Sequence, residues 1–260
     1  MSLREPGTDW MVQERHRTRG PDVEALFGEL DHVLDPELDE SILGLGFVES
    51  LQVEGGHVIV QVELPTFWCA ANFAYLIAHD IRARLLKVEG VERVMVSLKD
   101  HFASEQVEGG VNTGRSFAEA FPGEASGNLE TLRALFLRKG FIKRQESFLR
   151  CLLDAGLSPD EVCTLVVGDV RPQGESCTVA ARDRAVWAGP ADMPRRYLER
   201  RAEIGLDTSA QSPLFTDLEG RPMTPAGLER HLKSARLVRA SLEANTLICE
   251  ALLSARKARR

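Results

Sequence analysis

Two runs of alternating apolar and polar residues, joined by a glycine turn, constrain the fold of this 260-residue chain more than any other feature. In the run HVIVQVEL at 57–64, every second residue is valine or leucine, which is the period of a strand with one buried face. The run FVESLQV at 47–53 precedes it, and a turn at 54–56 contains two glycines. We therefore expect a β-hairpin whose apolar face must be covered by other elements.

The elements around the hairpin follow from apolar spacing and from prolines. Residues 23–34 repeat apolar positions at steps of three and four, which predicts a helix that starts after Pro21-Asp22 and ends at Asp35-Pro36. After Pro65 the run 69–86 has helical spacing again, and VERVMVSL at 91–98 has the pattern of a third strand. The order helix, hairpin, helix, strand predicts a compact unit in which helices cover one face of a small sheet.

The rest of the chain is predicted to be mainly helical. The polar, glycine-rich stretch from Asp100 to about Gly127 predicts an ordered extension followed by a linker. Beyond it we expect two helices broken near Gly140, a hairpin at 177–189, helices at 194–206 and 225–257, and a solvated basic tail that includes Arg256 and Lys257.

The expected fold class is α+β: a small N-terminal domain with a three-stranded sheet and two helices, and a mainly α-helical C-terminal domain. The expected boundaries are a flexible lead-in at 1–20, the first domain at 21–110, a linker at 111–127 and the second domain at 128–260. Charge supports the division. Residues 1–124 hold 22 acidic and 10 basic side chains, a net charge of -12, whereas residues 125–260 hold 17 and 22, a net charge of +5. A basic half can meet an acidic protein or a nucleic acid, or can be a solvated surface.

Several classes of protein are disfavoured by the sequence. No apolar run approaches the roughly 18 residues of a membrane span, and the start MSLREPGTDW lacks the apolar centre of a secretory signal, so we expect a cytoplasmic location. The five cysteines are widely spaced without a CxxC pair, which predicts free thiols instead of disulfides or a zinc knuckle. Because no phosphate-binding loop, nucleophile elbow or HExxH motif is present, we do not expect an ordinary enzyme.

Cys69 is the sharpest candidate for chemistry. It follows a proline-containing loop and opens a predicted helix, where free backbone N–H groups and the helix dipole stabilise a thiolate. Such a thiol can be a nucleophile or bind a soft metal. A cysteine beside Phe67 and Trp68 also suits the role of a small buried hydrophobe.

Four acidic residues and a histidine are further candidate ligands for iron. Asp100, His101 and Glu105 follow the third strand, and Asp35 and Glu37 follow the first helix. Each has a structural alternative: His101 can cap or pack, Asp35 can serve a turn before proline, and the other acids can be surface residues. The predicted metal-binding set is these five residues and the cysteine thiol.

Three pieces of the segment 22–100 occur in a characteristic order. They are Asp35-Pro36-Glu37, then Leu45-Gly46-Phe47-Val48 at the entry to the hairpin, and then Cys69 at the second helix. In this order the segment resembles the PaaD-like and SufT-like domain family of metal–sulfur cluster assembly factors. The loop around the cysteine, PTFWCAANFAYLIAHD, is similar to the subgroup associated with bacterial multicomponent monooxygenases that contain binuclear iron. The resemblance implies an assembly factor whose Cys69 handles a transient iron or iron–sulfur unit.

A weaker resemblance is carried by AGLSPDEVCTLVVGDV at 155–170 and by the stretch 197–235. These look like the catalytic domain of tyrosine recombinases. Ser158 stands where the arginine of that family would fall, no His-x-x-Arg follows residue 235, and neither Tyr75 nor Tyr197 lies in the terminal segment where the nucleophile should be. The resemblance implies a domain that has lost strand cleavage and keeps the scaffold, for recognition.

The sequence therefore predicts a cytoplasmic maturation factor that carries iron or iron–sulfur on Cys69 and docks on an apo-metalloenzyme client, such as the hydroxylase of a binuclear-iron monooxygenase. The sequence is also compatible with a homodimer, and neither a membrane nor a nucleic acid is the expected partner. The alternative is a DNA-binding or regulatory protein with a degenerate recombinase-like domain and a metal- or redox-sensing N-terminal domain. A third hypothesis is a structural adaptor whose Cys69 is inert.

Overall fold

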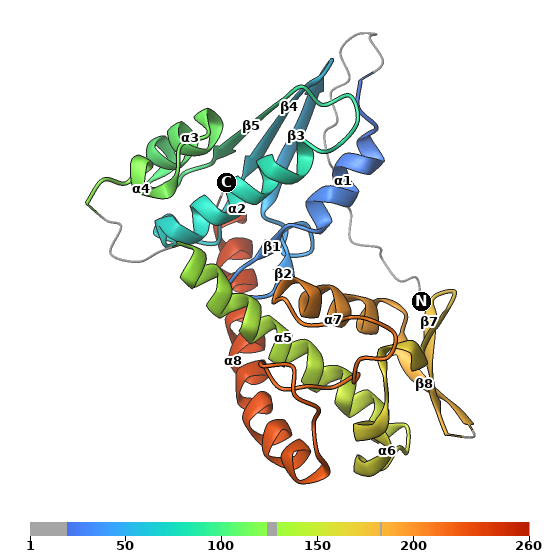
Figure 1. Cartoon of the computed structure of the whole chain (residues 1–260). Helices are drawn as coiled ribbons and strands as arrows, with labels where there is room; N and C mark the ends of the chain where they lie inside the picture. The colour runs from blue at the N-terminus through green and yellow to red at the C-terminus, as the bar shows by residue number, and fades with distance from the viewer. Residues whose placement is uncertain (1–19, 124–128, 183, 260) are drawn as a thin grey trace, which may run out of the picture. The chain divides into compact units, whose positions relative to one another are not determined.

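The computed structural model describes residues 20–123, 129–182 and 184–259, which divide into two compact units (Figure 1). The described residues up to Thr131 form the first unit together with those from Asn245 onwards, and Leu132–Ala244 form the second. The lead-in predicted at 1–20 lies outside the described residues except for Gly20, and so does the end of the predicted linker. The second domain predicted from the sequence includes 245–260. In the structure, the described part of that segment packs in the first unit.

The first unit opens with helix α1, Val23–Asp31, whose N-cap Asp22 accepts a hydrogen bond from the amide of Glu24 at 3.0 Å. The short strands β1, Leu34–Asp35, and β2, Glu40–Ser41, then pair antiparallel. The first helix ends at Asp31, earlier than the predicted end at Asp35-Pro36, and β1 occupies the two residues before that proline.

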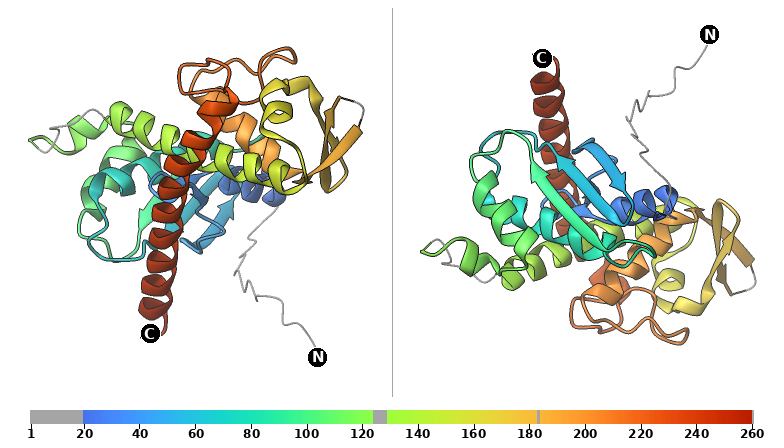
Figure 2. Two further views of the ribbon diagram at one scale, coloured as in Figure 1. Left: turned by 90° about the horizontal axis from the view of Figure 1, so that it is seen from below. Right: turned by 90° about the horizontal axis from the view of Figure 1, so that it is seen from above.

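A three-stranded sheet forms the centre of this unit (Figure 2). Strands β3, Val48–Glu54, and β4, His57–Val62, form an antiparallel hairpin, and helix α2, Ala71–Leu85, crosses over to β5, Arg93–Leu98, which runs parallel to β4. The expected hairpin, helix and third strand are confirmed. Val58, Val60 and Val62 are buried while Ile59 between them is exposed, so the alternation in the sequence does create one buried face.

Helices α3, Ser104–Thr113, and α4, Phe117–Ala120, follow β5 in the first unit and were not expected from the sequence. Helix α3 packs on β5 through Asn112, whose side chain accepts from the amide of Val96 at 2.9 Å and donates to its carbonyl at 2.8 Å. Gly114, with φ of 75°, ends α3 in the left-handed conformation that glycine adopts without strain. Much of the stretch predicted as extension and linker is therefore helical and covers the edge of the sheet.

The second unit has helices around a small sheet of its own. Its elements are α5 (Leu129–Asp154, which begins in the first unit), α6 (Pro159–Thr164), a 3₁₀ turn (Val167–Asp169), β6 (Val170–Gln173), β7 (Ser176–Ala181), β8 (Arg184–Pro190), α7 (Asp192–Glu203) and α8 (Pro225–Lys257, which ends in the first unit). The expected hairpin is β7–β8, and β6 pairs with it as a third strand.

The predicted break near Gly140 is wrong, because α5 is continuous. A glycine inside a helix costs only about 1 kcal/mol. Phe141, Phe148 and Leu149 of the same helix are fully buried in the core of the second unit, and burial of one large apolar side chain stabilises by about 1.5–3 kcal/mol. Packing therefore outweighs the local preference of Gly140.

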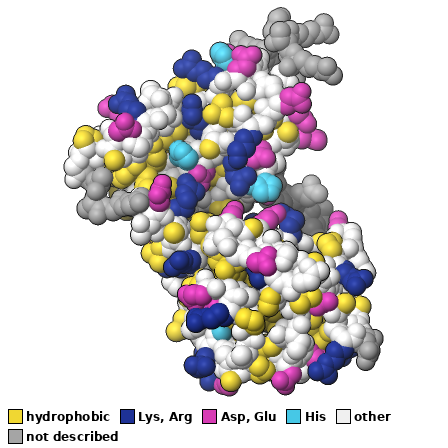
Figure 3. Space-filling model, in the orientation of Figure 1, with side chains coloured by type: hydrophobic (Ala, Val, Ile, Leu, Met, Phe, Trp, Pro, Cys, Tyr) yellow, Lys and Arg dark blue, Asp and Glu magenta, His cyan; other side chains and the backbone are white. Residues whose placement is uncertain are grey.

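Charged side chains of both signs are interspersed on the face shown in Figure 3. Several basic side chains of the second unit pair with acids, among them Arg221 with Asp217 at 2.7 Å and Lys233 with Glu229 at 2.8 Å. Among the described residues, no helix combines the length and the apolar character that crossing a bilayer requires.

Candidate functional site

Cys69 lies in the short loop between β4 and α2. The helix begins at Ala71, two residues later than the sequence suggested, and its N-cap, Ala70, has no side chain that can cap. The sulfur of Cys69 lies 3.1 Å from the hydroxyl oxygen of Thr66, and the residue is partly exposed. The loop therefore presents the thiol at the end of the sheet with one hydroxyl partner.

His101 supports this loop from behind. Its Nε2 donates to the carbonyl oxygen of Cys69 at 2.8 Å, and its Nδ1 accepts from the amide of Ala103 at 3.2 Å, which assigns the neutral Nε2-protonated tautomer. Burial lowers the pKa of His101, which favours the neutral ring. Asp100 makes the tight turn into His101 with φ of 48°. His101 therefore fixes the backbone of Cys69 and uses both ring nitrogens for the fold.

Three aromatic side chains near Cys69 are exposed. Trp68 is 73% exposed, Phe67 53% and Phe102 51%. The amide of Phe102 donates to the carbonyl of Phe67 at 3.1 Å, and their ring centroids are 6.3 Å apart. Large apolar side chains exposed in one cluster are typical of a surface that contacts another molecule.

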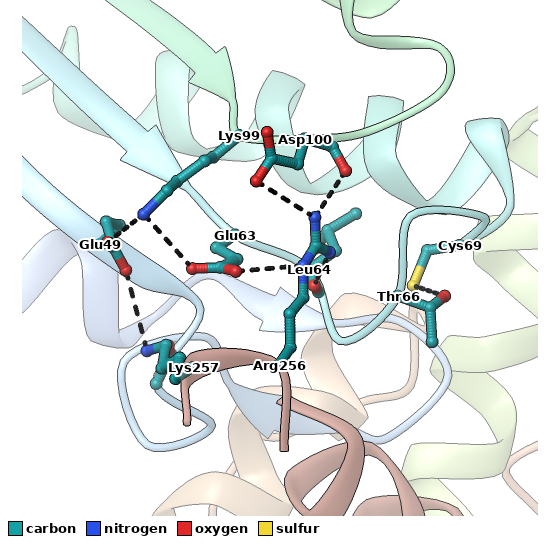
Figure 4. Close-up of polar contacts among 10 residues, drawn as sticks. Glu49, Glu63, Leu64, Thr66, Cys69, Lys99, Asp100, Arg256 and Lys257 are labelled. Atoms are coloured by element: carbon teal, nitrogen blue, oxygen red, sulfur yellow. Dashed lines mark hydrogen bonds and ion pairs between the residues drawn. The ribbon is translucent and has the colours of Figure 1, made fainter. Parts of the chain in front are cut away.

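The end of α8 holds the other side of the loop (Figure 4). The guanidinium of Arg256 donates to the carbonyl of Leu64, just before the cysteine loop, at 2.8 Å, and to the carbonyl of Asp100 at 2.6 Å. It also pairs at 3.2 Å with a carboxylate oxygen of Glu63, whose side chain is fully buried. Arg256 thus joins Leu64, just before the loop of Cys69, to Asp100, just before His101.

A network of charges surrounds that clamp (Figure 4). Lys99 lies 3.7 Å from the second carboxylate oxygen of Glu63 and also pairs with Glu49. Partial burial acts in the opposite direction, yet Lys99 holds the pKa of Glu49 below its usual value. Lys257 donates to the carbonyl of Gly46 at 2.9 Å. The prediction of a solvated tail is therefore wrong for Arg256 and Lys257, which anchor the end of α8 through carbonyl oxygens of the first unit and, for Arg256, through the buried carboxylate of Glu63.

Asp35 is the last residue of β1, and Glu37 lies in the turn that follows. One carboxylate oxygen of Asp35 accepts from the amides of Glu37 and Leu38, both at 2.9 Å, which is the turn role that the sequence left open. Burial raises the pKa of Asp35 to about 6, against the lowering effect of these hydrogen bonds.

The six predicted ligands do not form one metal centre. Within the described parts of the chain, no three His, Cys, Asp or Glu side chains are grouped so that they could hold a metal ion. His101 already bonds through both nitrogens, the side chain of Asp100 is 65% exposed, and Glu105 is exposed in the first turn of α3, a helix that starts after His101. Of the six predicted ligands, this leaves Cys69, whose thiol is partly exposed.

A second thiol near this site was missed by the sequence reasoning. Cys249, on α8, packs partly buried against the same apolar core as Cys69. Burial raises the pKa of Cys249 to about 11, and negative charge at Asp35, Cys69 and Glu37 adds to the rise. The only signal in the sequence was its spacing of four and seven residues from Leu253 and Arg256, which does not reveal what that helix face contacts.

The second unit uses its tyrosine and its inner arginines for packing. Tyr197 is fully buried among aromatic rings, and its hydroxyl donates to the carbonyl of Leu214 at 2.8 Å. Arg201, also buried, donates to the carbonyls of Pro213 and Leu214 at 2.7 and 2.6 Å. These groups hold a long loop in place.

One comparison with known proteins bears on function. Residues 24–98 match the family described as iron–sulfur cluster assembly protein. The match covers the hairpin, α2 and β5 and includes Cys69. Among curated proteins, none matches the chain.

Proposed function

We propose that the protein is an accessory factor in metalloenzyme maturation, on the premise that residues 24–98 are an iron–sulfur cluster assembly domain. In this proposal Cys69 receives iron or an iron–sulfur cluster as cargo and passes it to an apo-client. The protein carries out no turnover of its own. The cargo binds by ligand exchange at sulfur, the ligand type that iron–sulfur clusters use.

The observation that carries the proposal is the way the loop of Cys69 is held. The thiol is partly exposed and lies beside the hydroxyl of Thr66, while His101 and Arg256 bond the backbone on either side. A ligand on a braced loop keeps its position when cargo arrives and leaves. An inert core cysteine would not need such support.

The exposed aromatic cluster, Phe67, Trp68 and Phe102, is proposed as the contact surface for the client. It borders Cys69, so a client docked there would reach the cargo directly. The sequence of this loop resembles the subgroup associated with binuclear-iron monooxygenases, and we propose the apo-hydroxylase of such an enzyme as the client.

The second unit is proposed to recognise the client, not nucleic acid. Several of its arginines pack inside the unit or pair with neighbouring acids, as Arg195 does with Glu199 at 2.7 Å, so the unit presents charges of both signs instead of one basic face. In a mobility-shift assay on duplex DNA we expect no band shift even at low salt. A shift that weakens as salt rises would contradict this role.

The test is maturation of a client hydroxylase in cells. The hydroxylase is co-expressed with the wild-type protein, with Cys69→Ala, or with Cys163→Ala as a matched control in the second unit. We expect Cys69→Ala to lower the iron content and activity of the hydroxylase at least tenfold and Cys163→Ala to leave both unchanged. Equal iron content with all three would refute the role of the thiol.

A further inference from the structure

The last turns of α8 present one row of side chains to the first unit. Cys249, Leu253 and Arg256 are four and three residues apart, which places them on one face of the helix. Leu253 is 4% exposed and belongs to the core of the first unit, and Arg256 bonds to Leu64 and Asp100. These contacts fix the rotation of the helix, so Cys249 must face the first unit as well.

The core that Cys249 contacts is the one on which the loop of Cys69 also packs. Cys249 and Cys69 pack against the same core cluster. Asp35, Cys69 and Glu37 also act electrostatically on the Cys249 thiol, and such an effect falls off with distance. Two thiols from positions 180 residues apart in the sequence thus pack against one core, and the helix that carries Cys249 is bonded through Arg256 to Leu64, just before the loop of Cys69.

We propose that Cys69 and Cys249 together form a two-thiol site for an iron–sulfur cluster, with Cys249 as the second protein ligand. The inference rests on the proposed function and extends it to a residue outside the family-like segment 24–98. Two protein thiolates supply two of the four sulfur ligands that a cluster commonly takes. The other two positions stay with small thiols, or pass to cysteines of a client.

The exchange is balanced in protons and electrons. A cluster ligated by glutathione arrives, each protein thiol forms one iron–sulfur bond, and one glutathione iron–sulfur bond breaks for each. The protein thiol gives its proton to the glutathione thiolate that leaves. No oxidation or reduction takes place, and reversal of the same steps releases the cluster.

The test is anaerobic reconstitution of the full chain with ferrous iron, sulfide and glutathione. Iron and sulfide bound per chain and the visible absorption spectrum are measured for wild type, Cys69→Ser, Cys249→Ser and Cys163→Ser. We expect Cys249→Ser to lose at least tenfold in bound cluster, as Cys69→Ser does, and Cys163→Ser to behave as wild type. Cys249→Ala is measured in parallel, and circular dichroism checks that each variant is folded.

The outcomes separate the two proposals. If Cys249→Ser and Cys249→Ala load as wild type while Cys69→Ser does not, the second ligand is refuted and the proposed function stands. If wild type itself binds no cluster, both are refuted. An independent readout is thiol cross-linking of the empty wild-type protein with dibromobimane, followed by peptide mapping: a link between Cys69 and Cys249 is expected, and its absence overturns the inference.

Discussion

Replacement of Arg256 by methionine tests how the end of α8 is joined to the cysteine site. The variant keeps the apolar stem and removes the charge and the donors, while the carboxylate of Glu63 stays fully buried. Removing one partner of a buried ion pair costs about 3–5 kcal/mol. Lys99, at 3.7 Å from the other carboxylate oxygen, still compensates part of the charge, so we expect a loss of about 2–3 kcal/mol.

Thermal unfolding followed by circular dichroism measures this loss. At about 2–4 °C per kcal/mol for chains of this size, the melting temperature of Arg256→Met should fall by roughly 4–12 °C. Arg259→Met is the matched control, since Arg259 is exposed in the same tail, and a surface substitution changes stability by about 0.5 kcal/mol or less.

A double variant examines the cause of the loss. If the cost comes from a buried carboxylate left without its arginine, Glu63→Gln combined with Arg256→Met should lose clearly less than the sum of the two single changes. Strict additivity, or a melting temperature of Arg256→Met equal to that of Arg259→Met, would refute the reasoning.

Three further predictions concern other parts of the fold. In α3, a methyl group on Gly110 would lie 2.7 Å from the Cβ of Ala120, whereas Gly109 has open space; Gly110→Ala should lose about 1–3 kcal/mol and Gly109→Ala should gain about 0.5–1 kcal/mol, both by urea unfolding. The pKa of Asp35 is raised from 3.8 to about 6 in the folded chain. Because the folded chain therefore binds this proton more tightly than the unfolded chain does, the free energy of unfolding falls as pH rises from about 4 to 6 and then levels. Asp35→Asn keeps the acceptor oxygen and should therefore gain up to about 3 kcal/mol over wild type on going from pH 4 to pH 7, as measured by denaturation at both values. Tyr197→Phe should destabilise the second unit by about 1–2 kcal/mol through loss of a buried hydrogen bond, and an unchanged unfolding midpoint would contradict the packing role.

The sequence was most informative where periodicity was strong and local. The valines of β4, the apolar spacing of α2 and the run 91–98 predicted the hairpin, the helix and the third strand, but not that this strand runs parallel to β4. It failed where tertiary packing decides. Gly140 suggested a break that the buried aromatic residues of α5 override, and glycines and polar residues concealed α3, whose Val107 and Val111 are buried.

The candidate site was predictable only in part. Cys69 could be singled out from its loop, its position before a helix and its family resemblance. The structural role of His101 depends on hydrogen bonds to Cys69 and Ala103, which spacing cannot reveal. Arg256 reaches the site, and Cys249 packs on the same core, because α8 ends in the first unit, and a contact between residues so far apart in sequence has no local signature.

Iron and sulfide bound per chain after anaerobic reconstitution, with wild type and Cys69→Ser side by side, test the central claim most directly. The account predicts that wild type binds iron and inorganic sulfide in equal amounts with a sulfur-to-iron absorption band, and that Cys69→Ser, folded to the same extent, binds at most about a tenth as much. Equal loading of the two proteins would contradict the assignment of Cys69 as the thiol that carries the cargo.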